Sequence, residues 1–100
     1  MAVQAAFNPS YGTGVTVAPG VASASSNVGF GSKALVITNL STTVVSYVRV
    51  AEGATTATTA DYPVLPNSQI VLSKAGADDT VAYIAPAGGG SLHIMGGEGY

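Results

Sequence analysis

The chain has no cysteine and very few charged side chains. Without cysteine it can form neither a disulfide nor a thiolate metal site, and it offers no thiol nucleophile. Asp, Glu, Lys and Arg make up 8% of its 100 residues, whereas they make up roughly 25% of an ordinary soluble domain. Thr, Ser, Ala and Gly must therefore cover most of the surface, and hiding such side chains costs little free energy. The composition indicates a protein packed against neighbours; the alternative is a monomer kept soluble by its hydroxyl groups.

The scarcity of positive charge also limits the partners. Three Lys and Arg residues and a net charge of −2 do not provide the positive face that nucleic-acid phosphates require. No segment approaches the roughly 18 consecutive apolar residues of a membrane span. The amino terminus lacks the basic start and apolar block of a signal peptide. We therefore expect no nucleic-acid partner, no membrane partner and no export by the general secretion route.

The most strongly patterned segment is residues 34–51, ALVITNLSTTVVSYVRVA. Its first part, Leu35–Ile37, is apolar on both faces, which predicts a central strand with protein on each side. Asn39–Thr43 supplies a polar turn, because Asn and Ser side chains bond the local backbone. The second part alternates with period two. One side of it carries Val44, Ser46, Val48 and Val50, and the other carries Val45, Tyr47 and Arg49. We therefore predict a β-hairpin.

The rest of the chain repeats short apolar segments, separated by turn residues at spacings of about ten residues, with no helical periodicity. Leu92 and Ile94 should point into the core together. In another strand Ile84 should point inward, with Val81 and Tyr83 on the opposite face. The other expected strands are Val15–Val17, Val21–Ser25, Tyr62–Leu65, Gln69–Lys74, Thr80–Ala85 and Ser91–Met95.

This rhythm predicts an all-β fold, a single-domain antiparallel β-sandwich or jelly roll over residues 31–100. Pro63 and Pro66 confine their segment to a sheet edge. Residues 1–30 carry no charge and are rich in small side chains, so they form either a loosely structured arm ordered by another subunit or a pair of edge strands. We expect the glycine-rich ending, Gly96–Tyr100, to be flexible.

No group of residues has the spacing of a catalytic or metal site. His93 is the only histidine, and its alternation with two core-facing neighbours points it away from the core. Asp78 and Asp79 are adjacent in an expected turn, where accepting a backbone N–H explains them better than acid–base catalysis. We therefore expect no enzyme activity, no catalytic residue, no metal and no cofactor.

Aromatic residues are the best candidates for contacts, because tyrosine buries a large ring and keeps a hydroxyl for a hydrogen bond. Tyr47 beside Arg49, on the outward face of their strand, is the leading pair; its alternative role is to cover a second sheet. A carbohydrate-binding module, a further alternative, would need Tyr47, Tyr62 and Tyr83 on one sugar-stacking face. The expected interface residues are Phe7, Tyr11, Tyr47, Arg49, Tyr62 and Tyr100.

From Lys33 onward the chain resembles a group of small structural proteins from the virion modules of tailed bacteriophages. Four segments carry the resemblance: ALVITNLSTTVVSYVRV, YPVLPNSQIVL, DDTVAYIA and the closing GGGSLHIMGGEGY. Members of the group have the same order of an N-turn and V-R hairpin, a proline-containing step, an apolar strand and a Gly-Glu-Gly tail. Residues 1–30 add nothing to it.

The resemblance implies a capsid decoration, or cement, protein. Such a protein is a β-sandwich or jelly roll on the capsid exterior of the virion, where it bridges subunits of the major capsid protein and associates with other copies of itself. The resemblance implies no catalytic residues and assigns no individual contact residues. Within the same particle, a tail or fibre component is the alternative.

Overall fold

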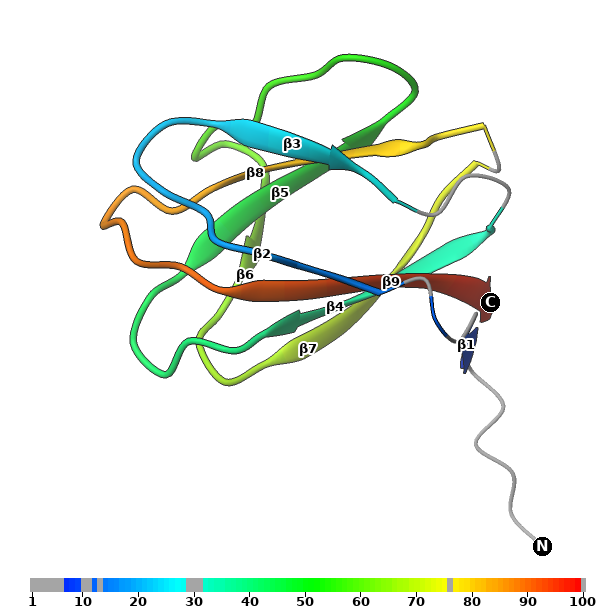
Figure 1. Cartoon of the computed structure of the whole chain (residues 1–100), viewed down its shortest axis with the longest axis horizontal. Coiled ribbons are helices and arrows are strands. Elements are labelled where there is room, and N and C mark those ends of the chain that lie inside the picture. The colour runs from blue at the N-terminus through cyan, green and yellow to red at the C-terminus, as the bar shows by residue number, and fades with distance from the viewer. Residues whose placement is uncertain (1–6, 10–11, 13, 29–31, 76, 100) are drawn as a thin grey trace, which may run out of the picture.

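The computed structural model describes residues 7–9, 12, 14–28, 32–75 and 77–99, and these residues form strands and no helix (Figure 1). The strands are β1 (Phe7–Pro9), β2 (Val15–Val17), β3 (Ala24–Asn27), β4 (Ala34–Asn39), β5 (Ser46–Ala51), β6 (Tyr62–Val64), β7 (Gln69–Ser73), β8 (Thr80–Ile84) and β9 (Leu92–Gly99).

The strands form two antiparallel sheets that pack face to face. In sheet A, β1 and β2 both pair with β9, which is followed by β4 and β7. Sheet B has the order β3-β8-β5-β6. Apart from β1, these are the two four-stranded sheets of a jelly roll. The predicted all-β sandwich is confirmed.

The core lies between the two sheets, and the period-two alternation decides which side chains enter it. Leu35 and Ile37 of β4 are fully buried, as are Leu92 and Ile94 of β9, so the predicted orientation of β9 is confirmed. From sheet B they are met by Val48, Val64, Val81 and Tyr83.

The segment before residue 30 supplies edge strands to both sheets. β2 lies at the predicted position, where Val15 is opposite Ile94. β3 begins at Ala24, later than the predicted Val21–Ser25, and pairs with β8. Val28, directly after β3, is buried in the core. Residues 1–6, 10, 11, 13, 29 and 30 of the predicted arm lie outside the described residues.

The predicted hairpin at residues 34–51 is wrong. β4 lies in sheet A between β9 and β7, and β5 lies in sheet B between β8 and β6. The polar turn therefore carries the chain from one sheet to the other instead of joining two paired strands. β4 is central, as expected, but Val36 on its outer face is partly exposed, so the expected cover on both faces is not seen in the described residues.

A buried amide explains why the chain crosses between the sheets at this point. Asn39 is 2% exposed, and its Nδ2 donates hydrogen bonds to the carbonyl oxygens of Val44 and Val64, each at 2.9 Å. Its Oδ1 accepts a hydrogen bond from the Ser41 N–H at 2.9 Å. The end of β4 in sheet A is thus bonded to the connection just before β5 and to the end of β6 in sheet B.

The predicted orientation of Ile84 is also wrong. Val81 and Tyr83 face the core, and the partly exposed Ile84 lies on the outer face of sheet B. The alternation in β8 is hard to see because Ala82, on the outer face, is fully buried as well. The Tyr83 hydroxyl shares a hydrogen bond of 2.8 Å with the Ser26 hydroxyl of β3.

The glycine-rich ending is a strand, contrary to the expectation of a flexible tail. β9 continues to Gly99, with Gly96 and Gly97 opposite Leu35 and Ala34 of β4. Gly97 to Gly99 also pair with β1. Pairing on both sides fixes a backbone whose composition alone suggests mobility. Tyr100 lies outside the described residues.

Replacing Asn39 should destabilise the whole fold. Asn39→Ala removes three hydrogen bonds and leaves two carbonyl groups without their amide donor, so we expect a loss of roughly 2 to 4 kcal/mol in the free energy of unfolding. Urea denaturation followed by circular dichroism measures this loss.

Ser46→Ala is the matched control, because Ser46 is fully buried in the same region and its Oγ has no hydrogen-bond partner among the described residues. We expect this variant to be as stable as the wild type or more stable, since a buried unpaired hydroxyl opposes folding. Equal losses from both substitutions would contradict the role of the Asn39 amide.

Candidate functional site

Four connections meet at one end of the sandwich, on the left in Figure 1: residues 18–23, 40–45, 65–68 and 85–91. Backbone hydrogen bonds join each of them to another. They run from Gly90 N–H to the Pro19 carbonyl, from Ala85 N–H to the Gly20 carbonyl, from Leu40 N–H to the Ser91 carbonyl, and from Asn67 N–H to the Ser41 carbonyl. We call this surface the uncharged end.

None of the residues in these four connections is Asp, Glu, Lys, Arg or His. The uncharged end instead exposes large apolar side chains. Val21 is 71% exposed, Leu65 60% and Leu40 51%. Charge is depleted at the core of protein–protein interfaces, and an exposed apolar surface with a polar rim is typical of such sites. The uncharged end is therefore the best candidate for an interaction surface.

The loops of the uncharged end are held by local hydrogen bonds and by their backbone conformation. The Ser41 Oγ accepts hydrogen bonds from the N–H groups of Thr43 and Val44. Asn67 has a φ of 58°, a left-handed turn conformation that Asn tolerates. A Cβ at Gly90 would approach Pro19 to 3.1 Å, so the two loops touch closely. A surface held in shape before binding loses less entropy when a partner docks.

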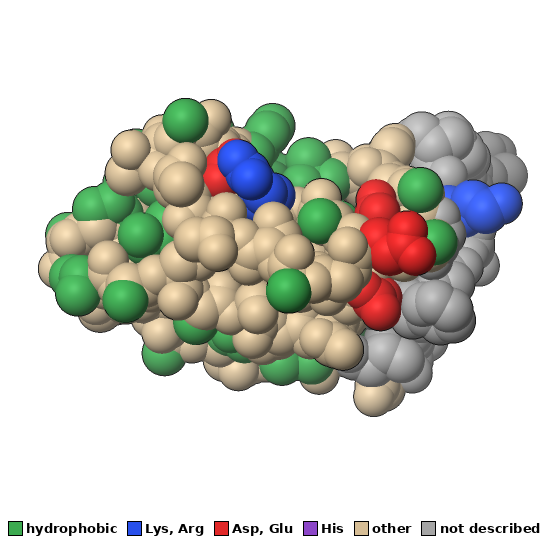
Figure 2. All heavy atoms as spheres, turned by 90° about the horizontal axis from the view of Figure 1, so that it is seen from above, with side chains coloured by type: hydrophobic (Ala, Val, Ile, Leu, Met, Phe, Trp, Pro, Cys, Tyr) green, Lys and Arg blue, Asp and Glu red, His purple; other side chains and the backbone are tan. Residues whose placement is uncertain are grey.

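The opposite end of the sandwich carries most of the charge, and we call it the charged end. There the Lys74 Nζ donates hydrogen bonds to the carbonyl oxygens of Ser32, Ala75 and Asp78. Figure 2, which looks onto the side of sheet B, shows charged side chains gathered in a few places and a large uncharged area between them. Five ionisable residues lie in the connections at the end opposite the uncharged end, close to where the strands begin or stop: Lys33, Glu52, Lys74, Asp78 and Asp79.

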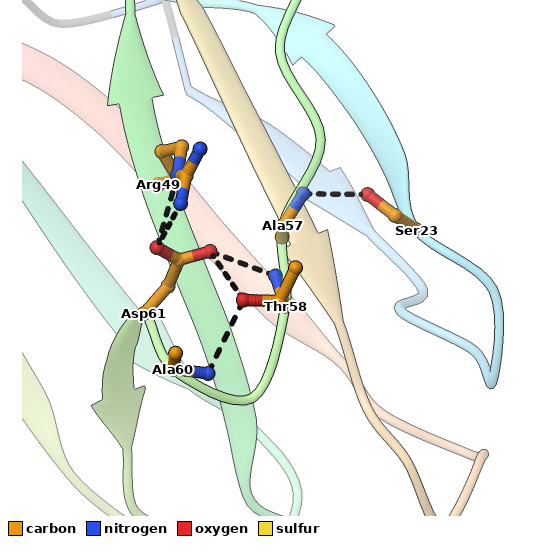
Figure 3. A network of polar contacts seen from close by, with 6 residues as sticks. All are labelled: Ser23, Arg49, Ala57, Thr58, Ala60 and Asp61. Atoms are coloured by element: carbon orange, nitrogen blue, oxygen red, sulfur yellow. Dashed lines mark hydrogen bonds and ion pairs between the residues drawn. The ribbon is translucent and has the colours of Figure 1, made fainter.

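The predicted pair Tyr47 and Arg49 lies on the outer face of sheet B, as expected. Arg49 is committed to an ion pair: its Nη2 lies 2.8 Å from the Asp61 Oδ1, and its Nε donates to the same oxygen at 2.9 Å (Figure 3). Asp61 Oδ2 accepts a hydrogen bond from the Thr58 N–H at 2.7 Å. The Arg49 charge therefore orders a loop of its own chain.

That loop, residues 52–61, lies across the outer face of sheet B (Figures 1 and 3). Its middle is anchored at the edge of the sheet, where the Ala57 N–H donates to the Ser23 Oγ at 2.9 Å. Its start is anchored by the Asp79 Oδ1, which accepts a hydrogen bond from the Gly53 N–H at 3.1 Å. Asp79 thus accepts a backbone N–H, as expected, but the N–H belongs to the loop after β5 and not to the turn before β8 that the aspartate was expected to cap.

Both anchoring carboxylates are more acidic than an ordinary aspartate. The hydrogen bond from the Thr58 N–H, helped by Arg49, lowers the pKa of Asp61 below the usual 3.8. The hydrogen bond from the Gly53 N–H, followed by that from the Thr80 hydroxyl, lowers the pKa of Asp79 below the same value. In each case the bonds favour the ionised form.

The other expected interface residues do not gather on one surface. Tyr62 is 50% exposed at the edge strand β6, where proline was expected to place an edge. Phe7 lies in β1, opposite Gly99. Tyr11 and Tyr100 lie outside the described residues. None of the four lies in the connections of the uncharged end, whose exposed residues the sequence reading missed. The signal was the lack of charge in every second turn segment along this part of the chain.

The three tyrosines expected to line a sugar-stacking face do not share one surface. Tyr83 is 6% exposed and faces the core, whereas Tyr47 is on the outer face of sheet B. Tyr62 pairs with the inward-facing Val48 and so lies on the opposite side of the sheet from Tyr47. The three rings do not form a sugar-stacking face.

The described residues contain no group of three His, Cys, Asp or Glu that could hold a metal ion. They also contain no helix with the length and hydrophobicity of a membrane span. His93 points away from the core, as predicted, and lies between Thr16 and Thr38 in the register of sheet A. A Cβ at Gly14 would lie 2.6 Å from the His93 ring, so the imidazole covers that glycine.

Acid should release the loop over sheet B. Because both pKa values are lowered in the folded state, the stabilisation is complete above the ordinary pKa of 3.8 and is lost as the pH falls through the lower folded values. We expect the amide-proton chemical shifts of Thr58 and Gly53 to change together with their carboxylates below about pH 4, as measured by NMR titration.

Asp61→Asn and Asp79→Asn are controls for each other. The first should abolish the acid transition at Thr58 and leave the one at Gly53, and the second should do the reverse. Transitions above the ordinary pKa would contradict the assignment.

Comparison with known proteins finds no matching family model and no matching curated protein. A de novo designed double-stranded β-helix is 17% identical, covering 86% of this chain and 96% of its own, with a TM-score of 0.47. A Bacillus endospore appendage protein, from a family of disulfide-linked pili, is 15% identical, covering 85% and 83%, with a TM-score of 0.49. The Drosophila NLP core, described for pentamer formation and histone binding, is 15% identical, covering 84% and 95%, with a TM-score of 0.36. At these identities and TM-scores, the likenesses carry no conclusion about function.

Proposed function

We propose that this protein is a non-enzymatic structural protein of a bacteriophage virion. It attaches to the capsid exterior, bridges subunits of the major capsid protein and stabilises the shell. Two features of the sequence support the proposal: the resemblance from Lys33 onward to small virion proteins, and a charged fraction of 8%. A surface with so little charge suits a protein that is covered by other subunits.

The observation that carries the proposal is the uncharged end. An ionised side chain that is buried without a partner costs several kcal/mol, and the uncharged end has none to bury. Val21, Leu40 and Leu65 already expose apolar surface there. Each would contribute favourable free energy when a partner removes it from water.

The same argument indicates what the partner surface is like. It should be apolar and without net charge, because an ionised group facing the uncharged end would lose its water and find no countercharge. The charged end then faces solvent, where Lys33 and Glu52 keep the particle surface hydrated. Each contact is modest, but many copies on a regular shell add their buried area, and bridging two subunits of the shell gains further from avidity.

A binding assay on undecorated capsids tests the proposal. The purified protein should attach to shells that lack it, give density at symmetric positions in particle images, and raise the temperature at which the shells open. Ala87→Glu, which adds one charge to an exposed position of the uncharged end, should weaken attachment about tenfold or more, because that charge must be desolvated.

Ala77→Glu is the matched control. It adds the same charge at an exposed position on the opposite end and should leave attachment unchanged. Equal effects from the two substitutions would contradict the assignment of the uncharged end as the contact surface. A protein that binds no shell, or that appears only in tails or fibres, would contradict the capsid role.

A further inference from the structure

Strand β7 is the longest edge strand of the sandwich in the described part of the chain. β1, β2 and β6 have three residues each, and β3 has four, whereas β7 has five. Among the described residues β7 pairs with β4 and with no other strand, so its other edge has no strand partner there (Figure 1). An open edge presents backbone N–H and C=O groups that can pair with another strand.

The register of β7 against β4 shows which backbone N–H and C=O groups of β7 do not bond β4. Lys74 N–H donates to the Lys33 carbonyl, and Asn39 N–H donates to the Ser68 carbonyl. In an antiparallel pair, hydrogen-bonded residues alternate with residues that point the other way. Ile70 and Leu72 therefore bond β4. The residues whose N–H and C=O groups point away from β4 are Gln69, Val71 and Ser73, all of them exposed.

The usual devices that protect an edge strand are missing from β7. Natural edges are blocked by proline, by charged side chains or by very short strands. β6 has Pro63, but β7 contains no proline and no charged residue. Lys74, next in sequence, directs its ammonium group to three loop carbonyls at the charged end. Gln69 Nε2 donates to the Thr38 Oγ1 of β4, which draws that side chain back over its own sheet.

We propose that β7 is a self-association edge that pairs with β7 of a second copy of this chain. The pairing is antiparallel and its two-fold axis passes beside Val71. In this register Val71 faces Val71 of the other copy, and Gln69 faces Ser73. Each of these residues uses both its N–H and its C=O, so six backbone hydrogen bonds form with no group left over.

The side chains agree with this register on both faces of the sheet. On the outer face, Val71 is 48% exposed and continues a row with Val36 and Met95 across sheet A. Two copies would join these rows through a valine–valine pair, which is favourable across strands. On the inner face, Ile70 would lie opposite Leu72 of the other copy, and both are only partly buried in one copy. No like charges meet anywhere along the contact.

Cysteine cross-linking tests the register, and the cysteine-free chain makes the experiment clean. Val71→Cys should form a disulfide-linked dimer under mild oxidation, because paired Cα atoms lie about 5.5 Å apart. Gln69→Cys alone should not, since the two Cys side chains would be about 13 Å apart along the strands. A mixture of Gln69→Cys and Ser73→Cys proteins should cross-link to each other.

Sedimentation at increasing protein concentration measures the association itself. We expect the wild type to dimerise, and both Val71→Pro and Val71→Lys to weaken dimerisation about tenfold or more, through the loss of a hydrogen bond and through charge repulsion respectively. Ser25→Lys, which puts the same charge on an edge strand of sheet B, β3, should dimerise like the wild type.

Three results would overturn the proposal: a wild type that stays monomeric at every concentration, a folded Val71→Lys protein that dimerises normally, or equal cross-linking of Val71→Cys and Gln69→Cys. Circular dichroism checks the folding of each variant, and Val71→Lys decides if Val71→Pro does not fold. The inference does not rest on a role in a virion.

Discussion

The fold depends on how one buried amide is satisfied. Asn39 ends a strand of sheet A, and its side chain bonds the carbonyl groups of Val44, just before β5, and Val64, the last residue of β6, in sheet B. Its own N–H donates to the Ser68 carbonyl, just before β7. Three connections are thus tied at one point inside the uncharged end. A core Leu at position 39 would fill the space but leave these carbonyl groups without donors, at a cost comparable to several lost hydrogen bonds. The hydrogen bonds of the Asn39 amide therefore favour a connection that crosses between the two sheets over a hairpin within one sheet.

The jelly-roll topology brings four uncharged turns, which are inconspicuous in the sequence, together on one surface. The uncharged turns at residues 18–23, 40–45, 65–68 and 85–91 are far apart in the chain, and each looks like an ordinary turn. Because strands cross between the sheets and run antiparallel, alternate connections fall at the same end. The connections at the other end carry the charge, as at Lys33 and Asp79. Arg49 and Asp61 are the exception, and they neutralise each other on the outer face of sheet B. Uncharged and charged connections alternate along the chain, and the topology places alternate connections at the same end, so the charge gathers at one end of the sandwich.

Local features of this fold could be predicted from the sequence, and partners of strands could not. Alternation placed Leu92 and Ile94 inside and Arg49 outside, and turn chemistry placed the bend before β8. Alternation failed at Ile84 because β8 is apolar on both faces, covered outside by the loop over sheet B. Alternation also did not indicate that β4 and β5 belong to different sheets, because the pairing of strands depends on residues far apart in the sequence. The same limit explains the candidate site: the tyrosines could be proposed as contact residues one by one, but no local rule brings Val21 beside the turn at Gly88.

The two proposed surfaces are geometrically independent, and this has a consequence for assembly. The uncharged end lies at the ends of the strands, whereas β7 runs along the side of the sandwich. Antiparallel pairing reverses the strand direction between copies, so a β7 pair carries its two uncharged ends at opposite poles. A single shell surface can cover only one of them, and the other would keep Leu40 and Leu65 in water. Attachment to a shell therefore gains nothing from β7 pairing, and a pair would instead connect two apolar surfaces. A charge at Ala87 should act on the first contact and a charge at Val71 on the second, because no described hydrogen bond links the two positions.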